Sequence, residues 1–186
     1  FAVYGQVWGA ERLLPSAIGS GRPFWYIDNG FWHPGCGSKF GHYRICYRGM
    51  MPVFLAGASD DRARATGVQM APWRADGRHI LFALPGHDYG RALGLNMPAW
   101  IRSTRRRINT VTRRPIVTRD RTSTVPLSQH LKHCWAVVTH SSNVAVEAAI
   151  AGIPVFVDAL AAAAPVGNTN LDLLDKPNMP GNREQW

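Results

Sequence analysis

Residues 135–158 constrain the fold more than any other part of this chain. An apolar stretch at 136–139 is typical of a buried strand, and it leads into a polar turn at 140–143. Helical periodicity follows over 144–151, and a second apolar stretch occupies 154–157. The order strand, helix, strand predicts a βαβ unit, and the two strands of such a unit lie parallel in one sheet.

The turn also predicts a binding function. Ser141, Ser142 and Asn143 stand at the start of the helix, where free backbone N–H groups and the helix dipole favour an anion such as a diphosphate. Glu147 follows about one turn later, where its carboxylate can accept hydrogen bonds from a pair of sugar hydroxyls. A structural interpretation stays open, because Ser and Asn are ordinary N-cap residues and a Glu near a helix start is commonly solvated.

The rest of the region 79–186 continues the alternation. Strands are predicted at 79–84 and 115–118, and helices at 98–111 and 127–133. We therefore expect an α/β fold with a Rossmann-like parallel sheet and helices on both faces. Such sheets bind ligands at the carboxyl ends of their strands. Those ends carry Pro85 and Gly86, Arg119 and Asp120, His140 with the following serines, and Asp158.

The N-terminal part is predicted to form a separate, abbreviated α/β lobe. Its expected elements are strands at 1–7, 23–27 and 42–47, and a short helix at 11–18 that Pro15 interrupts. Asp28, Asn29 and Gly30 predict a turn after the second strand. The expected organisation is thus an N-terminal lobe over 1–57, a polar linker or excursion over 58–78, and a second lobe over 79–186.

Arginine dominates the charge of the chain. The net charge is +9, with 18 Arg against 3 Lys, and eight of the arginines fall within 102–121, where only Asp120 opposes them. The planar fork of Arg suits phosphate oxygens, so this cluster favours a polyanion or nucleotide phosphates as partner. A solvated basic face, or one that meets an acidic partner chain, stays open as the alternative. The predicted nucleic-acid contacts, with double-stranded DNA as partner, are Arg102, Arg105, Arg106, Arg107, Arg113 and Arg114.

Several classes of site are not supported by the sequence. Cys36, Cys46 and Cys134 are too few and too scattered for a disulfide framework or a zinc site, and the histidines show no metal-binding spacing. We therefore expect no metal. No segment is long and apolar enough to span a membrane and no signal peptide opens the chain, which favours a cytoplasmic protein. Phe1 in place of Met indicates a fragment of a longer chain.

The turn and its surroundings resemble a known family. Residues 139–143, Glu147 with Ala148, and residues 151–155 are similar to the donor-binding signature of two-lobed (GT-B type) glycosyltransferases. That signature has a strand, a small-residue turn, a helix with a Glu, and Gly-x-Pro before the next strand. The segment also resembles capsule-polysaccharide transferases and phage-encoded proteins related to them. The match covers about 25 residues well. The usual two-lobed enzymes are roughly twice as long, so the resemblance implies an abbreviated GT-B-like architecture.

The resemblance implies roles for individual residues on the donor side. Ser141, Ser142 and Asn143 would cradle the diphosphate of a nucleotide sugar, and Glu147 would hold the ribose hydroxyls. Arg119 would neutralise the departing diphosphate. The catalytic residue His140 would stand beside the sugar or phosphate. The nucleotide sugar, expected to be a UDP-sugar, is a co-substrate, and no further cofactor is implied.

In the same family the N-terminal lobe faces the donor and supplies the acceptor base. Gly5 lies in a glycine-bearing segment placed like the loop that faces the donor phosphates. Asp28 is the candidate base, with His33 and His42 as further candidates behind it. An Asx turn that caps a hairpin is the structural alternative for Asp28.

The predicted function is therefore a metal-independent glycosyltransferase that moves a sugar to an acceptor hydroxyl. Because the arginine cluster favours a polyanion, the expected acceptor is a hydroxymethylated pyrimidine in phage DNA, modified in the host cytoplasm. The aromatic residues Phe24, Trp25, Tyr26, Phe31 and Trp32 could stack on the base, although most of them are expected to form core. The alternatives are a polysaccharide-directed transferase, a sugar-nucleotide epimerase, for which the three Glu of the chain are a thin supply of acids, and a non-catalytic nucleic-acid-binding domain.

Overall fold

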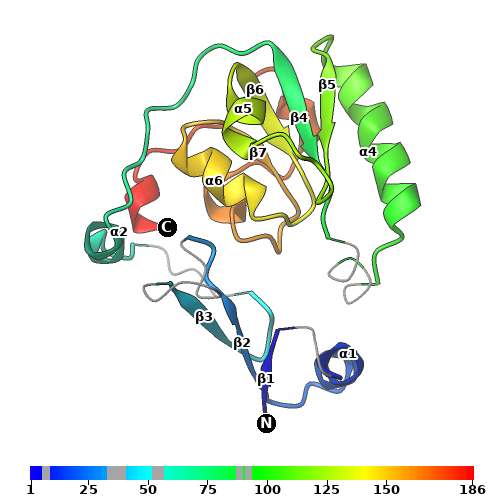
Figure 1. The fold of residues 1–186 in the computed structure, drawn as a ribbon, viewed down its shortest axis with the longest axis vertical. Helices are drawn as coiled ribbons and strands as arrows, with labels where there is room; N and C mark the ends of the chain where they lie inside the picture. Colours follow the sequence, from blue (N-terminus) through cyan, green and yellow to red (C-terminus); the bar gives the residue numbers. More distant parts are fainter. Residues whose placement is uncertain (6–8, 33–40, 52–56, 87–89, 91–93) are drawn as a thin grey trace. The chain divides into compact units, whose positions relative to one another are not determined.

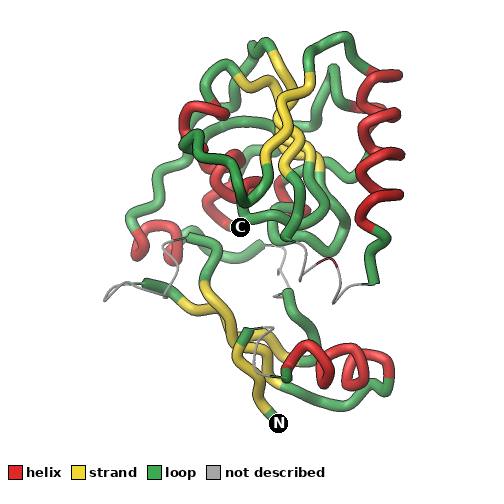
Figure 2. The backbone as a smooth tube through the Cα atoms, turned by 45° about the vertical axis from the view of Figure 1, so that its right-hand side comes forward, coloured by secondary structure: helices red, strands yellow, loops and turns green. Residues whose placement is uncertain are grey.

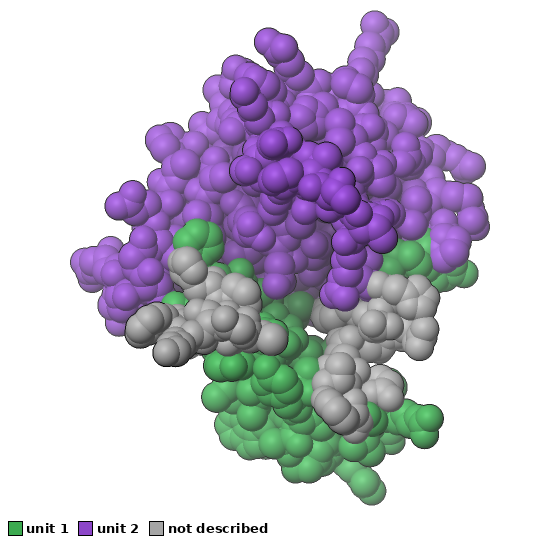
Figure 3. All heavy atoms as spheres, viewed as in Figure 1, with its two compact units in different colours: residues 1–53, 87–97 green, residues 54–86, 98–186 purple. Residues whose placement is uncertain are grey.

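The computed structural model describes residues 1–5, 9–32, 41–51, 57–86, 90 and 94–186. The chain forms two compact units, which Figure 3 distinguishes by colour. Unit 1 comprises Phe1–Val53 and His87–Met97, and unit 2 comprises Phe54–Gly86 and Pro98–Trp186. Residues 58–78, expected as a linker or excursion, belong to unit 2, where they form helix α2 (Asp61–Thr66) and an irregular segment after it.

Four parallel strands form the sheet of unit 2, in the order β5-β4-β6-β7. They are β4 (His79–Ala83), β5 (Ile116–Arg119), β6 (Cys134–Val138) and β7 (Val155–Phe156). Every residue of the inner strand β6 is buried, which explains why its sequence is apolar throughout and does not alternate. The prediction of an α/β fold with a parallel sheet is confirmed.

Helices cover both faces of this sheet. On one face lies α4 (Met97–Val111), whose Ile108 joins a buried cluster with Ile80 of β4. On the other face α6 (Val144–Ile150) packs against β6 and β7, and the small side chains of its alanines allow a close approach. The short helix α5 (Leu127–Leu131) leads into β6. Figures 1 and 2 show α4 on one side of the strands and α6 on the opposite side.

The order of the strands reverses between β4 and β6. From β4 the chain passes through α4 to β5 on one side of β4, and then through α5 to β6 on the other side. Because right-handed crossovers in opposite directions lie on opposite faces of a sheet, the carboxyl ends of β4 and β6 are left uncovered between them. Such a reversal is the usual position of a ligand in an α/β sheet.

A buried arginine holds the segment that follows β7 against the rest of unit 2. It contains three short 3-10 helices, η1 (Ala164–Val166), η2 (Leu171–Leu173) and η3 (Arg183–Gln185). The guanidinium of Arg183 lies 3.9 Å from the centre of the Trp73 ring. It donates hydrogen bonds to the carbonyl oxygens of Ala71 and Ala149. One side chain therefore joins the segment after α2, the end of α6 and η3.

Unit 1 is a three-stranded sheet with one helix packed on it. Strands β1 (Ala2–Tyr4) and β2 (Trp25–Asn29) are parallel, and β3 (Tyr43–Tyr47) is antiparallel to β2. Helix α1 (Ala10–Gly19) contributes Leu14 and other apolar residues to the core of this unit. The helix continues through Pro15, which was expected to interrupt it, and the proline is exposed.

Strand β2 extends beyond its predicted end. Asp28 and Asn29 were expected in a turn, but they pair in register with Arg44 and Tyr43 of β3. The carboxylate of Asp28 accepts a hydrogen bond at 2.7 Å from the Arg44 guanidinium, which makes a strand position favourable for this acid. The turn prediction at these two residues was therefore wrong, because a partner distant in sequence satisfies the side chain that would otherwise bond within a turn.

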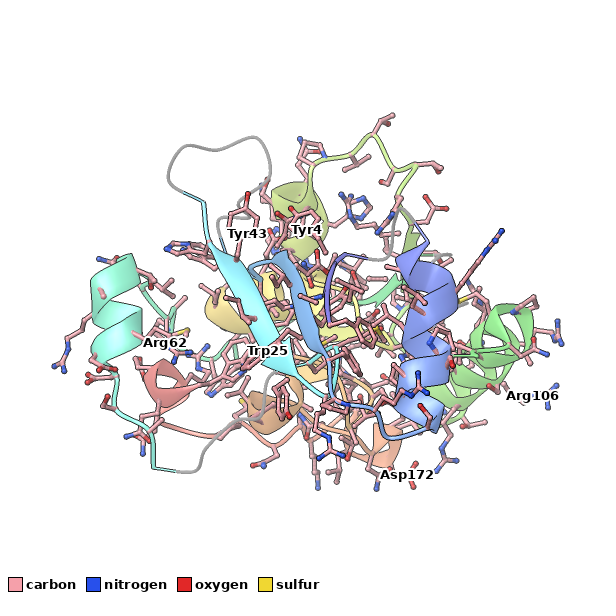
Figure 4. All side chains as sticks on the ribbon, turned by 90° about the horizontal axis from the view of Figure 1, so that it is seen from below. Tyr4, Trp25, Tyr43, Arg62, Arg106 and Asp172 are labelled. Atoms are coloured by element: carbon pink, nitrogen blue, oxygen red, sulfur yellow. The ribbon has the colours of Figure 1, made fainter. Side chains whose placement is uncertain are left out.

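The aromatic residues of β2 divide between the two faces of the sheet of unit 1. Tyr26 is buried under α1 together with Phe24, whereas Trp25 is 50% exposed on the opposite face. Tyr4 and Tyr43 are also exposed there, and Figure 4 looks onto this face. The prediction that most of these aromatic residues form core is met by Phe24 and Tyr26 and not by Trp25.

Candidate functional site

A cavity of about 160 Å³ lies in unit 2 at the carboxyl ends of β6 and β7. Val138 and Phe156, the last residues of these strands, line it together with Trp100 and Thr104 from the inner face of α4. The polar groups come mainly from residues that follow a strand or lie in the C-terminal segment, namely Thr139, His140, Asp158 and Thr169. The cavity therefore occupies the α4 side of the uncovered edge of the sheet.

His140 is held in an unusual environment at this cavity. Its side chain is 14% exposed, and its Nε2 lies 3.8 Å from Oδ2 of Asp158. The edge of the ring faces Trp100, with 5.8 Å between ring centres. Its Nδ1 is buried and has no hydrogen-bond partner among the described residues. Since buried polar atoms are nearly always hydrogen-bonded, this nitrogen is a candidate contact for a ligand.

In the turn that follows His140, some polar groups form hydrogen bonds within the described part of the protein and one side-chain hydroxyl does not. The Ser142 hydroxyl accepts a hydrogen bond from the Val144 N–H at 3.3 Å, so it serves as a cap of α6. The next N–H groups, of Ala145 and Val146, donate to main-chain carbonyls of the turn at 3.0 Å. Asn143 is exposed and makes no capping bond. Ser141 Oγ is buried without a partner in the described part of the chain, so it is the hydroxyl of the turn that remains for a ligand.

Arg119 and the helix that carries Glu147 lie on the other face of the sheet. Thr118 contacts Arg105 of α4, so the next residue, Arg119, points to the opposite face, where α6 lies. Its Nη1 donates to Ser123 Oγ at 3.2 Å and to the Val125 carbonyl at 2.5 Å.

Glu147 is exposed as a whole, but the partial burial of its carboxyl raises the pKa, and the charge of Arg119 opposes that rise. The same arginine acts on a second titratable group nearby. The pKa of His130 is lowered by burial and then by the positive charge of Arg119. The positive charge of Arg119 therefore acts on both Glu147 and His130.

Asp28, the predicted acceptor base, is committed to hydrogen bonds within unit 1. Its Oδ2 accepts from the Tyr26 hydroxyl and from Arg44 Nη2, both at 2.7 Å. Its Oδ1 accepts from the Asn29 N–H at 2.7 Å. Burial and the hydrogen bond to Asp28 raise the pKa of Tyr26, so the tyrosine stays a proton donor in this cluster. Both oxygens of the carboxylate thus have structural partners.

Of the other residues predicted in the N-terminal part, Gly5 has a clear backbone role. Its φ of 60° lies in the left-handed region that favours glycine, and its N–H donates to the Ile27 carbonyl at 2.8 Å. Gly5 therefore ends β1 beside β2. His33, predicted as a catalytic residue, lies outside the described residues, as does Cys36.

The predicted nucleic-acid contacts separate into paired and unpaired arginines. Arg107 forms an ion pair with Asp172, and Arg114 forms one with Asp175. The Arg114 guanidinium also lies 4.2 Å from the centre of the Trp135 ring, which makes it part of the packing of the C-terminal segment. The sequence cluster contains only Asp120 as an opposing acid, but the fold brings two more from a distant segment. Of the six predicted contacts, Arg102, Arg106 and Arg113 are exposed and make no ion pair or side-chain hydrogen bond in the described part of the chain.

The described side chains offer no arrangement of three or more His, Cys, Asp or Glu that could hold a metal ion. None of the described helices is long and apolar enough to cross a membrane. Cys46 and Cys134 are buried as free thiols, and burial raises the pKa of Cys134 to about 11.

Sequence reasoning missed several residues of the cavity, among them Asp158, Trp100 and Thr104. Asp158 was recognised as a strand end but not as a site residue, although a carboxylate directly after a predicted strand is a usable signal. Trp100 and Thr104 are one helical turn apart on α4 and face inward. Nothing in a helical pattern distinguishes such residues from core residues, because both face the sheet.

Among known proteins, no family model matches this chain and no curated protein is found as a relative.

Proposed function

We propose that unit 2 binds a nucleotide sugar and that the protein is a GT-B-type glycosyltransferase, which transfers the sugar to an acceptor hydroxyl. The observation that carries the proposal is the cavity at the carboxyl ends of β6 and β7, with His140 and Asp158 facing each other at 3.8 Å. The segment that resembles the donor signature, 139–155, supplies Thr139 and His140 of that cavity and the turn beside it. Motif and cavity thus support the same assignment.

The size of the cavity indicates which part of the donor it receives. Its volume of about 160 Å³ is below the ~300–1,000 Å³ typical of pockets that enclose a whole ligand, so it accommodates one ring, which we assign to the sugar. The diphosphate then lies at the edge of the sheet beside the Ser141 hydroxyl. The nucleoside extends toward Glu147, where the carboxylate accepts hydrogen bonds from the ribose.

In the proposed reaction the acceptor oxygen attacks the anomeric carbon, and the bond from that carbon to the diphosphate oxygen breaks. The electron pair leaves with the diphosphate, whose growing negative charge is stabilised by Arg119 and by the Ser141 hydroxyl. The proton of the acceptor passes to the His140 imidazole, and Asp158 stabilises the resulting imidazolium. We do not assign Asp28 to this step, because its carboxylate oxygens accept hydrogen bonds from Tyr26, Asn29 and Arg44 in unit 1.

Calorimetric titration with UDP and UDP-sugars tests donor binding. Glu147→Gln should weaken binding about tenfold, which corresponds to one lost hydrogen bond to a charged group. Glu184→Gln is the matched control, since Glu184 is exposed in η3 and should leave affinity unchanged. Transfer is measured by release of the nucleoside diphosphate, and His140→Gln should slow release more than it weakens donor binding. Absence of binding to every nucleotide tested would refute the proposed function.

A further inference from the structure

Helix α4 has two chemically different faces. Its inner face carries Trp100 and Thr104 at the cavity and Ile108 in the core. The outer face carries the exposed residues Arg102, Ser103, Arg105, Arg106, Asn109 and Thr110, and the helix contains no acid. Arg102, Arg105 and Arg106 share one side of the helix because they are three and four residues apart, and Arg113, two residues after the end of the helix, is also exposed. We call these four residues the arginine stripe.

The charge of the stripe is not compensated by neighbouring acids. No described acid forms an ion pair with any of its four members, whereas the adjacent Arg107 and Arg114 are paired with Asp172 and Asp175. Figure 4 shows the Arg106 side chain directed outward from α4. Arg105 is held in position by a hydrogen bond of 2.7 Å to Thr118 Oγ1, which uses one of its five donors.

The residues between the arginines restrict the kind of partner. A helix that lies on a membrane surface buries large apolar side chains beside its basic residues, but Ser103, Asn109 and Thr110 occupy those positions here. A protein interface has an apolar or aromatic centre, which this face also lacks. Phosphate groups require only fork-shaped cationic donors on a polar surface, and a row of arginines supplies them.

We propose that the arginine stripe binds the sugar–phosphate backbone of a nucleic acid. From Arg102 to its end at Val111, α4 rises by roughly 14 Å at ~1.5 Å per residue, a length over which a duplex carries about eight phosphates. Contacts of this kind fix position and do not read base sequence. The inner face of the same helix lines the cavity, so the bound polymer lies about one helix diameter, ~10 Å, from it. The assignment of this nucleic acid as the acceptor rests on the proposed function.

Fluorescence anisotropy with labelled duplex DNA, single-stranded DNA and RNA of one sequence tests the proposal, in the absence of any nucleotide sugar. The stripe variant combines Arg102→Gln, Arg106→Gln and Arg113→Gln. Its matched control combines Arg12→Gln, Arg22→Gln and Arg62→Gln, three exposed arginines elsewhere whose loss changes the net charge equally. Thermal melting checks that both variants fold.

We expect the stripe variant to bind at least about tenfold more weakly and to lose about 2.7 from the slope of log K against log salt, which is ~0.9 for each of the phosphate contacts removed. The control should keep the wild-type slope. The nucleic acid that binds most tightly identifies the source of the phosphate backbone. Equal weakening in both variants, or competition by polyglutamate as strong as by DNA, would overturn the proposal. Because no donor is present, this failure is distinguishable from failure of nucleotide binding.

Discussion

Replacing Arg183 with alanine should destabilise unit 2 substantially. The guanidinium donates to the carbonyls of Ala71 and Ala149 and lies 3.9 Å from the centre of the Trp73 ring. Hydrogen bonds to charged groups contribute about 1.5–3 kcal/mol each, and a desolvated cation–π contact contributes about 2 kcal/mol. The Ala149 carbonyl keeps a second donor, the Gly152 N–H at 3.2 Å, so the loss is below the sum. We expect about 2–4 kcal/mol, because contributions from one side chain are not additive.

Hydrogen exchange measures this effect where it arises. The Ala71 N–H donates to the Ile150 carbonyl at 2.9 Å and the Arg74 N–H to the Gly152 carbonyl at 2.6 Å, so both amides report on the attachment of this segment. In Arg183→Ala their exchange should accelerate by about 30-fold to several hundred-fold. Arg62→Ala, at an exposed position of α2, is the control and should leave these amides unchanged. Exchange in Arg183→Ala within about threefold of wild type would refute the assigned role.

Three further predictions concern unit 2. Gly152→Ala should lower the free energy of unfolding by about 2–4 kcal/mol, as measured by urea denaturation. The φ of Gly152 is 74°, and a Cβ at this position would collide with the Pro72 carbonyl oxygen. A variant as stable as the wild type would contradict this packing. Burial raises the pKa of Glu147 above its ordinary value of 4.5, so the folded protein binds a proton at this carboxyl more tightly than the unfolded chain does. The stability that this proton adds is fully present below pH 4.5 and is lost as the pH rises through the pKa of Glu147 in the folded protein. Glu147→Gln should therefore gain stability relative to wild type toward neutral pH, and parallel pH profiles in urea denaturation would speak against the shift. Since the pKa of Cys134 is about 11, iodoacetamide at about pH 8 should leave this thiol unmodified in the native protein, and peptide mapping that finds rapid labelling would exclude its burial.

The fold of unit 2 was largely predictable because its signals are local. The apolar stretches of β4, β6 and β7 are long enough to stand out, and each is bounded by polar or glycine-bearing turns. Predictions failed where a distant partner determines the conformation. Asp28 lies in a strand because Arg44 faces it, and residues 58–78 pack in unit 2 because Arg183, more than a hundred positions later, holds the segment at Ala71.

The candidate site was predictable in its polar turn and less so in its walls. Arg119 at the end of β5 acts on the pKa of Glu147 in α6, and His140 lies at the cavity. The sequence alone did not separate Ser141, whose hydroxyl is unpartnered in the described region, from Ser142, which caps α6, because the two residues are chemically identical. It also did not identify which arginines are neutralised, since Asp172 and Asp175 lie in a segment that follows the sheet.

The division of the chain into units has a mechanical consequence. The chain passes from one unit to the other at 53–54, at 86–87 and at 97–98, so a single cut cannot separate them. The last of these passages enters the first turn of α4, two residues before Trp100 at the cavity wall. A rotation of unit 1 would therefore pull directly on the helix that shapes the cavity on one face and carries the arginine stripe on the other. The connection at 97–98 would therefore transmit a force from unit 1 to both the cavity wall and the arginine stripe.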